Sequence, residues 1–372
     1  NCLSFFDLFC NDYSNLGARD FEVNTPGVRE LTYLIQYEDI VNQKSEKVAK
    51  SVFKYYNIRY VIIHKNYLTE SEFSFVEKFL ADAGLQLKHE EGDLVVYEVP
   101  QEKISFFAVL SKNWYGVELW NKIPSRWISN NATISIYSPT NQSYKLSFSI
   151  LSFYKPRTLW VYLNDGLVYN QEVPTKFEEV SVLLSLKEGM NVVCFYSPDG
   201  CQRPVDIPEL NNRDSRCLSF AFQNIVIEPI EAWNFLDIGT TEARKYLING
   251  WSEDEISGNL SFVWADALNS SVLVVLDEER PLNLSFRCHP FVFNESANQE
   301  LWVYFNGNFV ASLNLTKGWK DYSVLIPSEF TKKGINYLEF KYRYAERPKD
   351  YGINEDTRTL AAAFDWIRLS NT

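Results

Sequence analysis

The sequence predicts a mainly β protein, with a small N-terminal α/β domain followed by two tandem, jelly-roll-like antiparallel β-sandwiches. The first observation is a long internal repeat. Trp160-Val161-Tyr162-Leu163-Asn164 recurs as Trp302-Val303-Tyr304-Phe305-Asn306, and Asp214-Ser215-Arg216 recurs as Asp356-Thr357-Arg358, both at an offset of 142 residues. The second observation is a period-two alternation of apolar residues through the repeated region. A repeat of this length indicates two globular domains and not a solenoid.

Four segments follow from these patterns. Residues 1–24 are predicted to be an irregular leading segment, 25–112 the α/β domain, 113–231 the first sandwich and 232–372 the second sandwich.

The α/β domain is predicted from alternating helix and strand signals. A helical stretch at 48–57 precedes the apolar, β-branched run 58–63, which is typical of a buried strand. Thr69 and Glu72 form a capping-box pattern at the start of a helix that ends at Gly84. The residues that follow predict a hairpin.

Each sandwich is predicted from short alternating strands separated by turn residues. Residues 132–137, 146–150 and 159–163 alternate apolar and polar side chains. Asn306-Gly307 is a type I′ turn signal, and Asn164-Asp165-Gly166 is its counterpart in the first copy. Strands of this spacing without long helices favour antiparallel sandwiches.

Composition limits the class of protein. The chain has 372 residues, 46% of them hydrophobic, and a net charge of −12, so no nucleic-acid partner is expected. No apolar run reaches the roughly 18 residues that a membrane span needs. The chain has one Met and does not begin with it. We therefore expect a processed or excised piece of a precursor, with membrane contact only through a segment outside this sequence.

Glycosylation sequons and cysteines indicate an extracytoplasmic location, at the cell surface or secreted. The Asn-x-Ser/Thr sequons, all in the repeated region, are Asn131, Asn141, Asn259, Asn269, Asn283, Asn294 and Asn314. Chance in a Ser- and Asn-rich chain is the alternative explanation. Two disulfides are predicted, Cys2–Cys10 and Cys201–Cys217. Cys194 and Cys288 lie in apolar strand contexts typical of buried thiols, and their pairing stays open.

The repeated charged residues form the first candidate site. They are Arg203, Asp206, Asp214 and Arg216 in the first copy, and Arg347, Asp350, Asp356 and Arg358 in the second. Residues two apart in a strand face the same side, so each Asp-x-Arg element predicts an ion pair. One interpretation is a structural clamp that ties the Arg-Pro loop to the last strand. The alternative is a polar floor for a sugar or a calcium ion, but no calcium-loop pattern occurs, so no cofactor is predicted.

Tryptophans form the second candidate site. The candidates are Trp120, Trp127, Trp251 and Trp264, near the front of the two sandwiches. Exposed indole rings stack on the apolar faces of sugars, so these residues predict a carbohydrate-binding surface. The alternative is that they are core residues on inner strand faces. Trp160 and Trp302, embedded in strands, are predicted to be core.

The sequence shows no catalytic constellation. Its histidines are His64, His89 and His289, and no Ser/His/Asp spacing, nucleophile elbow or phosphate loop occurs. Glu90 with Glu91 and Glu253 with Glu255 are carboxylate pairs of the kind that glycoside hydrolases use, but in an acidic chain such pairs are typical of solvated surface. The chain itself is not predicted to be an enzyme, with a glycoside hydrolase as the alternative.

Three stretches carry a resemblance to a known family. They are Gly200-Cys201-Gln202-Arg203-Pro204 with Asp214-Ser215-Arg216-Cys217-Leu218, Tyr55 to Lys65, and Asp356-x-Arg358-x-Leu360. They resemble the extracytoplasmic C-terminal regions of archaeal multi-spanning membrane glycosyltransferase-like proteins, which are related to dolichyl-phosphate-mannose mannosyltransferases. The resemblance spans nearly the whole chain and implies an extracytoplasmic location and a link to surface glycans or lipid-linked sugars. The family's catalytic acidic residues lie in loops that this chain lacks, so none is carried over.

Taken together, the sequence predicts a non-catalytic, extracytoplasmic glycan-binding or glycan-positioning region of a membrane glycosyltransferase or cell-surface protein. The expected partners are surface glycans or a lipid-linked sugar. The alternative is a structural subunit of an extracellular filament or surface layer, which would self-associate into a polymer.

Overall fold

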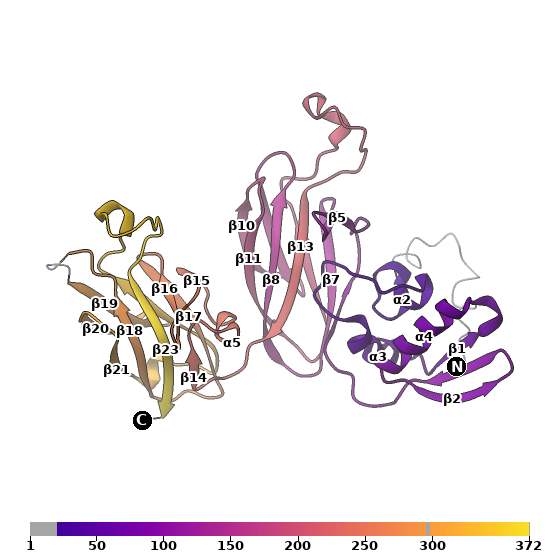
Figure 1. Cartoon of the computed structure of the whole chain (residues 1–372), viewed down its shortest axis with the longest axis horizontal. Helices are drawn as coiled ribbons and strands as arrows, with labels where there is room; N and C mark the ends of the chain where they lie inside the picture. The colour runs from indigo at the N-terminus through magenta and orange to yellow at the C-terminus, as the bar shows by residue number, and fades with distance from the viewer. Residues whose placement is uncertain (1–20, 295–297, 372) are drawn as a thin grey trace. The chain divides into compact units, whose positions relative to one another are not determined.

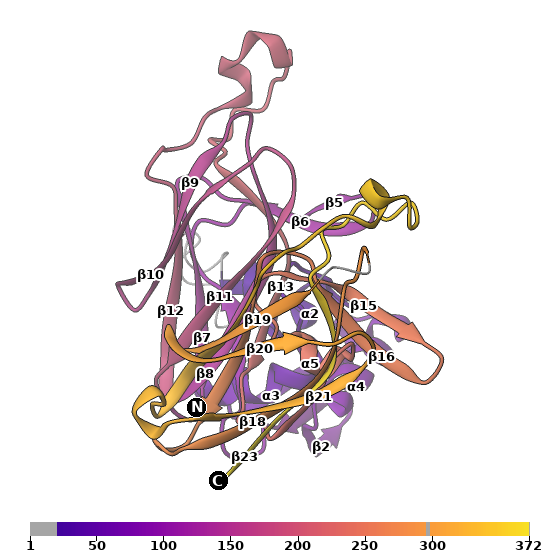
Figure 2. The same cartoon turned by 90° about the vertical axis from the view of Figure 1, so that its left-hand side faces the viewer.

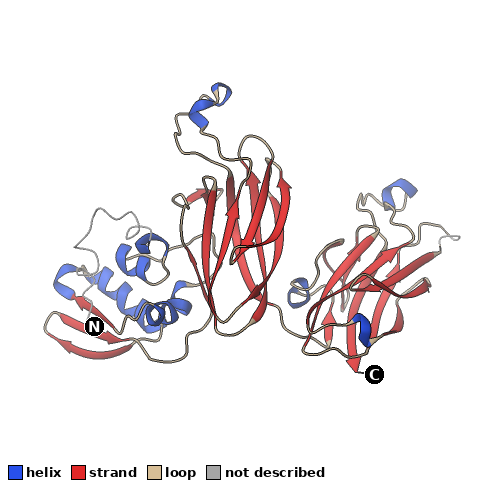
Figure 3. Cartoon of the chain, turned by 180° about the vertical axis from the view of Figure 1, so that it is seen from behind, coloured by secondary structure: helices blue, strands red, loops and turns tan. Residues whose placement is uncertain are grey.

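The computed structural model describes residues 21–294 and 298–371, and it confirms the mainly β fold with helices gathered in the N-terminal part (Figures 1 and 3). The chain forms two compact units, Asn1–Ile227 and Glu228–Thr372. The first unit holds the α/β part and the first sandwich, and the second unit holds the second sandwich. Among the described residues, no helix is long and apolar enough to cross a membrane.

The α/β part packs three α-helices on a small antiparallel sheet. Its elements are α2 (Val28–Tyr33), α3 (Ser45–Tyr55), β1 (Tyr60–His64), η1 (Lys65–Tyr67), α4 (Glu70–Asp82), β2 (Gln86–Glu91) and β3 (Leu94–Glu98), in the sheet order β1-β3-β2. Phe53 of α3 and Phe79 of α4 share one core with the sheet. The predicted capping box is confirmed, because Thr69 Oγ1 accepts from Glu72 N–H and Glu72 Oε2 accepts from Thr69 N–H at 2.8 Å. These bonds satisfy donors that the helix start leaves free.

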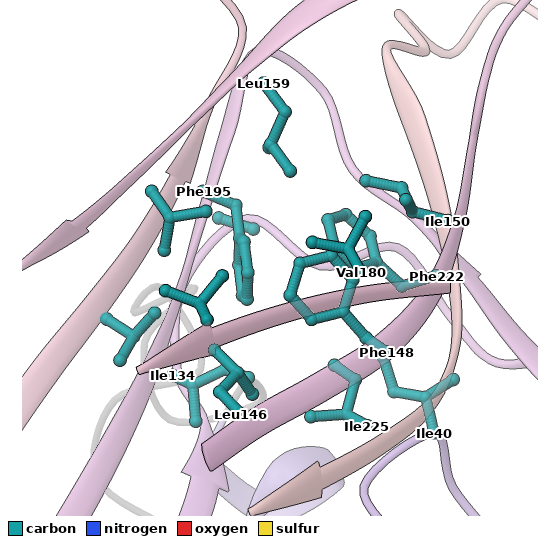
Figure 4. Close-up of a cluster of buried hydrophobic side chains, with 14 of the residues drawn as sticks. Ile40, Ile134, Leu146, Phe148, Ile150, Leu159, Val180, Phe195, Phe222 and Ile225 are labelled. Atoms are coloured by element: carbon teal, nitrogen blue, oxygen red, sulfur yellow. The ribbon is translucent and has the colours of Figure 1, made fainter. Parts of the chain in front are cut away.

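The first sandwich consists of two five-stranded sheets, with the orders β10-β9-β12-β7-β4 and β11-β8-β13-β6-β5. Its strands are β4 (Phe107–Leu110), β5 (Glu118–Trp120), β6 (Ile123–Trp127), β7 (Asn131–Ser138), β8 (Gln142–Ser152), β9 (Arg157–Leu163), β10 (Gly166–Val173), β11 (Glu178–Leu186), β12 (Gly189–Tyr196) and β13 (Phe220–Pro229). The loop before β13 contains η2 (Pro204–Asp206) and η3 (Pro208–Leu210). Alternate residues of both sheets meet in one core, where Phe148, Phe195 and Phe222 pack together (Figure 4).

A buried ion network joins the α/β part to the first sandwich within the first unit. Arg126 of β6 donates to both oxygens of Asp39 at 2.7 Å, and Arg29 of α2 donates to the same carboxylate at 3.0 Å. Glu30 accepts from Arg29 at 2.8 Å, so two cations face two carboxylates. Ile40, the residue after Asp39, lies in the sandwich core. The segment around Asp39 is therefore held against the first sandwich by an ion network that is buried from solvent.

The second sandwich pairs a six-stranded sheet with a four-stranded one. The six-stranded sheet has the order β15-β16-β23-β18-β21, with β14 also paired to β23, and the other sheet has the order β17-β22-β19-β20. The elements are β14 (Phe235–Asp237), α5 (Thr241–Arg244), β15 (Trp251–Ser257), β16 (Leu260–Ala265), β17 (Asn269–Leu276), β18 (Leu282–Pro290), β19 (Gln299–Phe305), β20 (Asn308–Leu315), β21 (Lys320–Ile326), η4 (Ser328–Phe330), β22 (Gly334–Tyr342), η5 (Pro348–Tyr351) and β23 (Ala362–Asn371).

The sequence repeat is also a structural repeat. Ala221 pairs with Trp127 across β13 and β6, and Ala363 pairs with Trp264 across β23 and β16. Each sandwich also carries one loop that projects beyond its strands just before the last strand (Figures 1 and 2). Equivalent residues therefore occupy equivalent faces, so the two sandwiches can be compared position by position.

Candidate functional site

Aromatic side chains cover part of the outer side of the sheet that contains β13. Phe222 points into the core, so its neighbour Ala221 and the paired Trp127 point outward. We call this cluster the first aromatic face; its members are Tyr115, Trp120, Trp127, Phe153 and Phe177. Trp120 meets Trp127 edge-on at 5.4 Å and Phe177 at 6.1 Å. Trp127 is buried beneath this layer, whereas Trp120 is half-buried and presents part of its ring.

A carboxylate and a guanidinium border the first aromatic face. Glu118 Oε2 accepts from Trp120 Nε1 at 3.0 Å, and Glu118 Oε1 accepts from Arg216 Nη1 at 2.7 Å. Arg216 also lies over the Tyr115 ring at 5.3 Å and pairs with Asp214 at 2.7 Å. The hydrogen bonds from Arg216 hold the pKa of Asp214 below its usual range. Fixed donors and acceptors therefore stand beside a fixed aromatic ring.

The second sandwich repeats this arrangement with different rings. The second aromatic face consists of Phe262, Trp264, His289, Phe291 and Trp319. The His289 ring lies 6.1 Å from Trp264 and 5.7 Å from Trp319, and Phe262 lies 5.7 Å from Trp319. His289 Nδ1 accepts from Gly318 N–H at 3.2 Å, so the neutral ring carries its proton on Nε2. Burial lowers the pKa of His289, which favours this neutral form.

The charged border recurs as well. Arg358 donates to Glu255 at 2.6 Å and to Asp356 at 2.7 Å, as Arg216 does to Glu118 and Asp214. Glu255 was predicted to be solvated surface, and this prediction is wrong because its side chain is only one-third exposed and holds Arg358. Its neighbour Glu253 is exposed.

The Asp-x-Arg pairs form for a different reason from the predicted one. The prediction placed both elements in strands, but each lies in the loop before the last strand. Asp214 Oδ1 accepts from the Arg216 backbone N–H at 2.9 Å, and Asp356 Oδ1 accepts from that of Arg358 at 2.9 Å. Such a side-chain turn brings residues two apart together without a strand.

The other charged residues of the predicted clamp lie farther along the same loops. Arg203 and Asp206 form an exposed ion pair at 2.8 Å, separate from Asp214. In the second loop, Asp350 N–H donates to the Arg347 carbonyl at 3.1 Å. These residues shape the projecting loops and do not border the aromatic faces.

Each projecting loop is braced at its base in its own way. Cys201 and Cys217 form a disulfide with Cα atoms 5.3 Å apart. In the second sandwich Phe293, which follows β18, stacks on Tyr351 of the projecting loop at 4.4 Å and meets Tyr344 at 5.0 Å. The remaining cysteines that the structure describes are free thiols: Cys194 is half-buried and Cys288 is buried, and burial raises the pKa of both. Cys2 and Cys10 lie outside the described residues.

The predicted tryptophans divide into three groups. Trp264 and Trp120 lie on the two aromatic faces, with Trp127 beneath the first. Trp251 packs on the core residue Phe364 at 5.3 Å and donates to the Ser271 carbonyl at 2.8 Å, so it lies at the sandwich edge and not on the second aromatic face. Trp160 and Trp302 were predicted to be core; this is wrong, because their strand neighbours fill the core and leave both indoles half-buried on the outer side of the other sheet.

The remaining predicted residues lie away from both faces. Glu90 pairs with Lys65, and Glu91 lies 3.4 Å from His89 on the α/β hairpin. Among the sequons, Asn283 is half-buried and accepts from Ser323 at 2.7 Å. The exposed sequon residues are Asn131, Asn141, Asn259, Asn269, Asn294 and Asn314. Over residues 21–294 and 298–371, no three His, Cys, Asp or Glu side chains gather in the way that a metal ion requires.

Several site residues escaped the sequence analysis. They are Glu118, Phe153, Phe177, Phe262, His289, Phe291 and Trp319. The repeat finds one pair of the missed residues: aligning Phe148 with Phe286 places Phe153 on Phe291, an aromatic pair that neither copy reveals alone.

The second unit also contains a cavity of about 400 Å³, lined by Trp233, Phe235, Leu236, Asp237, Thr240, Glu242, Ala243, Lys245 and Tyr246.

Comparison with known proteins finds no matching family model and no matching curated protein sequence. Similar solved structures include the tandem CBM22-1–CBM22-2 domain of Xyn10C from Paenibacillus barcinonensis, at 14% identity and a TM-score of 0.25, with 72% of this chain and 94% of that chain covered. A family 35 carbohydrate binding module from an environmental isolate matches at 16% identity and a TM-score of 0.23, with 34% and 89% covered. The ANX2 ectodomain from Arabidopsis thaliana matches at 10% identity and a TM-score of 0.24, with 67% and 84% covered. At TM-scores this low, function has to be read from the side chains of this chain itself.

Proposed function

We propose that this chain is a non-catalytic glycan-binding region whose two aromatic faces are the binding surfaces. One observation carries the proposal: both sandwiches place half-buried aromatic rings beside a carboxylate–guanidinium pair, at equivalent positions on an outer sheet side. The C–H face of a sugar stacks on an aromatic ring, while its hydroxyls need donors and acceptors at the ring's border.

Preorganisation supports a binding role for Trp120. Its ring is held by the bond to Glu118 and by edge contacts with Trp127 and Phe177, so little freedom is lost when a ligand stacks on it. Each Glu118 oxygen accepts one bond and keeps a free lone pair, and Arg216 Nη1 donates one N–H and keeps the other free. A vicinal diol presents the matching donors and acceptors.

Glycan-array and polysaccharide-binding measurements test the proposal, with Trp120→Ala and Trp160→Ala as matched variants. Both indoles are half-buried on outer sheet sides of the same sandwich, and Trp160 has Tyr162 and Tyr196 as neighbours. Only Trp120 bonds the carboxylate of the Glu118–Arg216 pair. We expect the chain to bind at least one surface glycan, and Trp120→Ala to weaken that binding while Trp160→Ala does not. The proposal is wrong if no glycan binds, or if both variants behave alike.

The finer part of the proposal concerns location. We propose that the region lies outside the cytoplasm, beside a membrane glycosyltransferase or on a cell-surface protein, and positions a surface glycan or lipid-linked sugar. The disulfide and the exposed sequons support this location. Mass spectrometry of the native protein tests it: sequon glycans and an oxidised Cys201–Cys217 pair are expected, whereas a reduced, unglycosylated protein in the cytoplasm would contradict it.

Self-association is a second candidate function. The observation that favours it is β10, an edge strand that exposes Leu167 and Val168. An exposed apolar edge is a template for pairing with another chain. Sedimentation velocity and electron microscopy decide between the two functions: ordered polymers of the native protein support a structural subunit, and a monomer over a wide concentration range rejects it.

A further inference from the structure

The outer side of the six-stranded sheet in the second unit carries a second group of rings beyond the aromatic face. Phe235 of β14 and Trp366 of β23 have ring centroids 6.1 Å apart. The guanidinium of Arg368 lies 5.3 Å from the first ring and 5.4 Å from the second. Phe235 is 47% exposed and Trp366 is half-buried, so a ligand can reach both rings.

Polar groups flank Trp366 on the neighbouring strands, because Arg287 of β18 and Asp237 of β14 both pair with it in register. Arg287 of β18 pairs with Asp365 of β23 at 3.3 Å. Asp237 of β14 accepts from the Ser261 hydroxyl at 3.2 Å. We call the outer surface from Trp264 to Phe235 the aromatic strip. Asp365 is 7% exposed overall and Asp237 is exposed, so the aromatic strip offers both shielded and open hydrogen-bonding groups. Rings in a row with hydrogen-bonding groups beside them suit an amphipathic, chain-like ligand.

The cavity of the second unit opens at the same end of the sheet. Phe235 and Asp237 line the cavity and also belong to the strip, so the two are continuous. Trp233 and Tyr246 form its aromatic wall, with centroids 6.1 Å apart. This hollow is open to solvent and adds room beside Phe235 at one end of the row of rings.

Strand register gives the length of the strip. Trp264 pairs with Ala363, and Phe235 pairs with Arg368 on the same strand. At about 3.3 Å per residue this puts Trp264 roughly 15 Å from Phe235. Trp366 lies between them, because it pairs with Arg287, two residues along β18 from His289. That span suits a few linked pyranose rings and exceeds what one ring can bridge.

In the described part of the first unit, from residue 21 on, the second pair of rings has no equivalent. Phe222 corresponds to Phe364, so Asn224 stands where the second unit has Trp366. The same outer side in the first unit continues with neutral polar residues, where Gln223 donates to Ser125 at 2.7 Å and Ser147 bonds Ser181 at 3.0 Å. The two units therefore differ in site length although they share a fold.

From this geometry we propose that the outer sheet side of the second unit is an extended site for a linear oligosaccharide. The oligosaccharide stacks on Trp264 and Trp319 at one end and on Trp366 and Phe235 at the other. Its hydroxyls are bound by Arg287 and Asp237, which flank Trp366. The proposal rests on the proposed glycan-binding function. It adds that the second unit, unlike the first, binds long oligosaccharides more tightly than short ones.

Calorimetry on the full chain with Trp120→Ala in the first unit tests this proposal. The probes are β-1,4-linked gluco- and manno-oligosaccharides, from the disaccharide to the hexasaccharide. We expect affinity to rise about tenfold or more with length. Adding Trp366→Ala should abolish that rise and leave disaccharide affinity unchanged, while Trp302→Ala, on the opposite sheet of the same unit, should change neither.

Two outcomes separate this proposal from the broader one. If affinity does not depend on length, or if Trp366→Ala lowers affinity for all lengths equally, the extended site is wrong and glycan binding stands. If the unmodified chain binds no member of either series, the extended site and glycan binding by the second unit both fail for these probes. Phe235→Ala, at a more exposed ring, repeats the test should Trp366→Ala lower the melting temperature.

Discussion

Replacing Asp39 by Asn tests the buried network that joins the α/β part to the first sandwich. The carboxylate is 1% exposed and accepts from Arg126 and Arg29, which are 1% and 5% exposed. Asn keeps the shape but removes the charge, so two guanidinium groups are left facing one carboxylate, that of Glu30. Breaking a buried ion pair from one side costs about 3–5 kcal/mol, since the remaining charge stays desolvated.

Differential scanning calorimetry measures this loss directly. For a unit of this size, 1 kcal/mol corresponds to about 2–4 °C, so the first unit should melt roughly 6–20 °C lower in Asp39→Asn. Glu102→Gln is the matched control, because Glu102 pairs with Lys50 at 2.7 Å but is 66% exposed. The control should melt with the unmodified chain. Equal melting temperatures for the two variants would refute the view that this network holds the first unit together.

Three further predictions concern the sites and their supports. Replacing Cys201 and Cys217 by Ser should lower the free energy of unfolding by up to about 3 kcal/mol, because the disulfide joins residues 16 positions apart. The projecting loop should then be cleaved in limited proteolysis. An unchanged cleavage pattern and unchanged stability would argue against a bracing role for the disulfide. Glu118→Gln should cost about 1 kcal/mol or less, since the pair with Arg216 is one-third exposed, yet lower glycan affinity of the first aromatic face in calorimetry, and unchanged affinity would remove Glu118 from the site. Burial lowers the pKa of His289 in the folded chain, so the unfolded chain takes up the proton first as pH falls below about 6.5. The melting temperature of the unmodified chain should therefore fall below this pH, and that of His289→Gln should lack this fall. Parallel pH profiles of the two melting temperatures would contradict this.

Local patterns in the sequence predicted much of the fold. The repeat, the alternation and the capping box at Thr69 depend on residues close in the chain or on matching copies, and the mainly β fold follows from them. The Arg126–Asp39 contact joins residues 87 positions apart, and no spacing rule brings such a pair together. The link between the α/β part and the first sandwich was therefore beyond the reach of sequence patterns.

The candidate site shows the same limit. Alternation tells which strand residues leave the core, but Trp120 and Trp160 both leave it, on different sheets. Strand periodicity places Trp120 beside Glu118. Only the folded chain brings Arg216 to them, because it lies in a loop 98 residues from Glu118. Trp251 and Trp264 looked equivalent in sequence, yet one packs on core Phe364 and the other pairs with outward-facing Ala363. Of the ten residues that form the two aromatic faces, the tryptophan pattern named three: Trp120, Trp127 and Trp264.

Glycan binding by the two aromatic faces is tested most directly by titrating one bound polysaccharide into two double variants of the full chain. Trp120→Ala with Trp264→Ala removes a ring from each aromatic face, and Trp160→Ala with Trp302→Ala removes a half-buried indole from each opposite sheet. Loss of two stacking rings should weaken affinity by about tenfold or more. The first double variant should show this loss and the second should bind as the unmodified chain does. Full affinity in the first double variant would contradict the assignment of both faces.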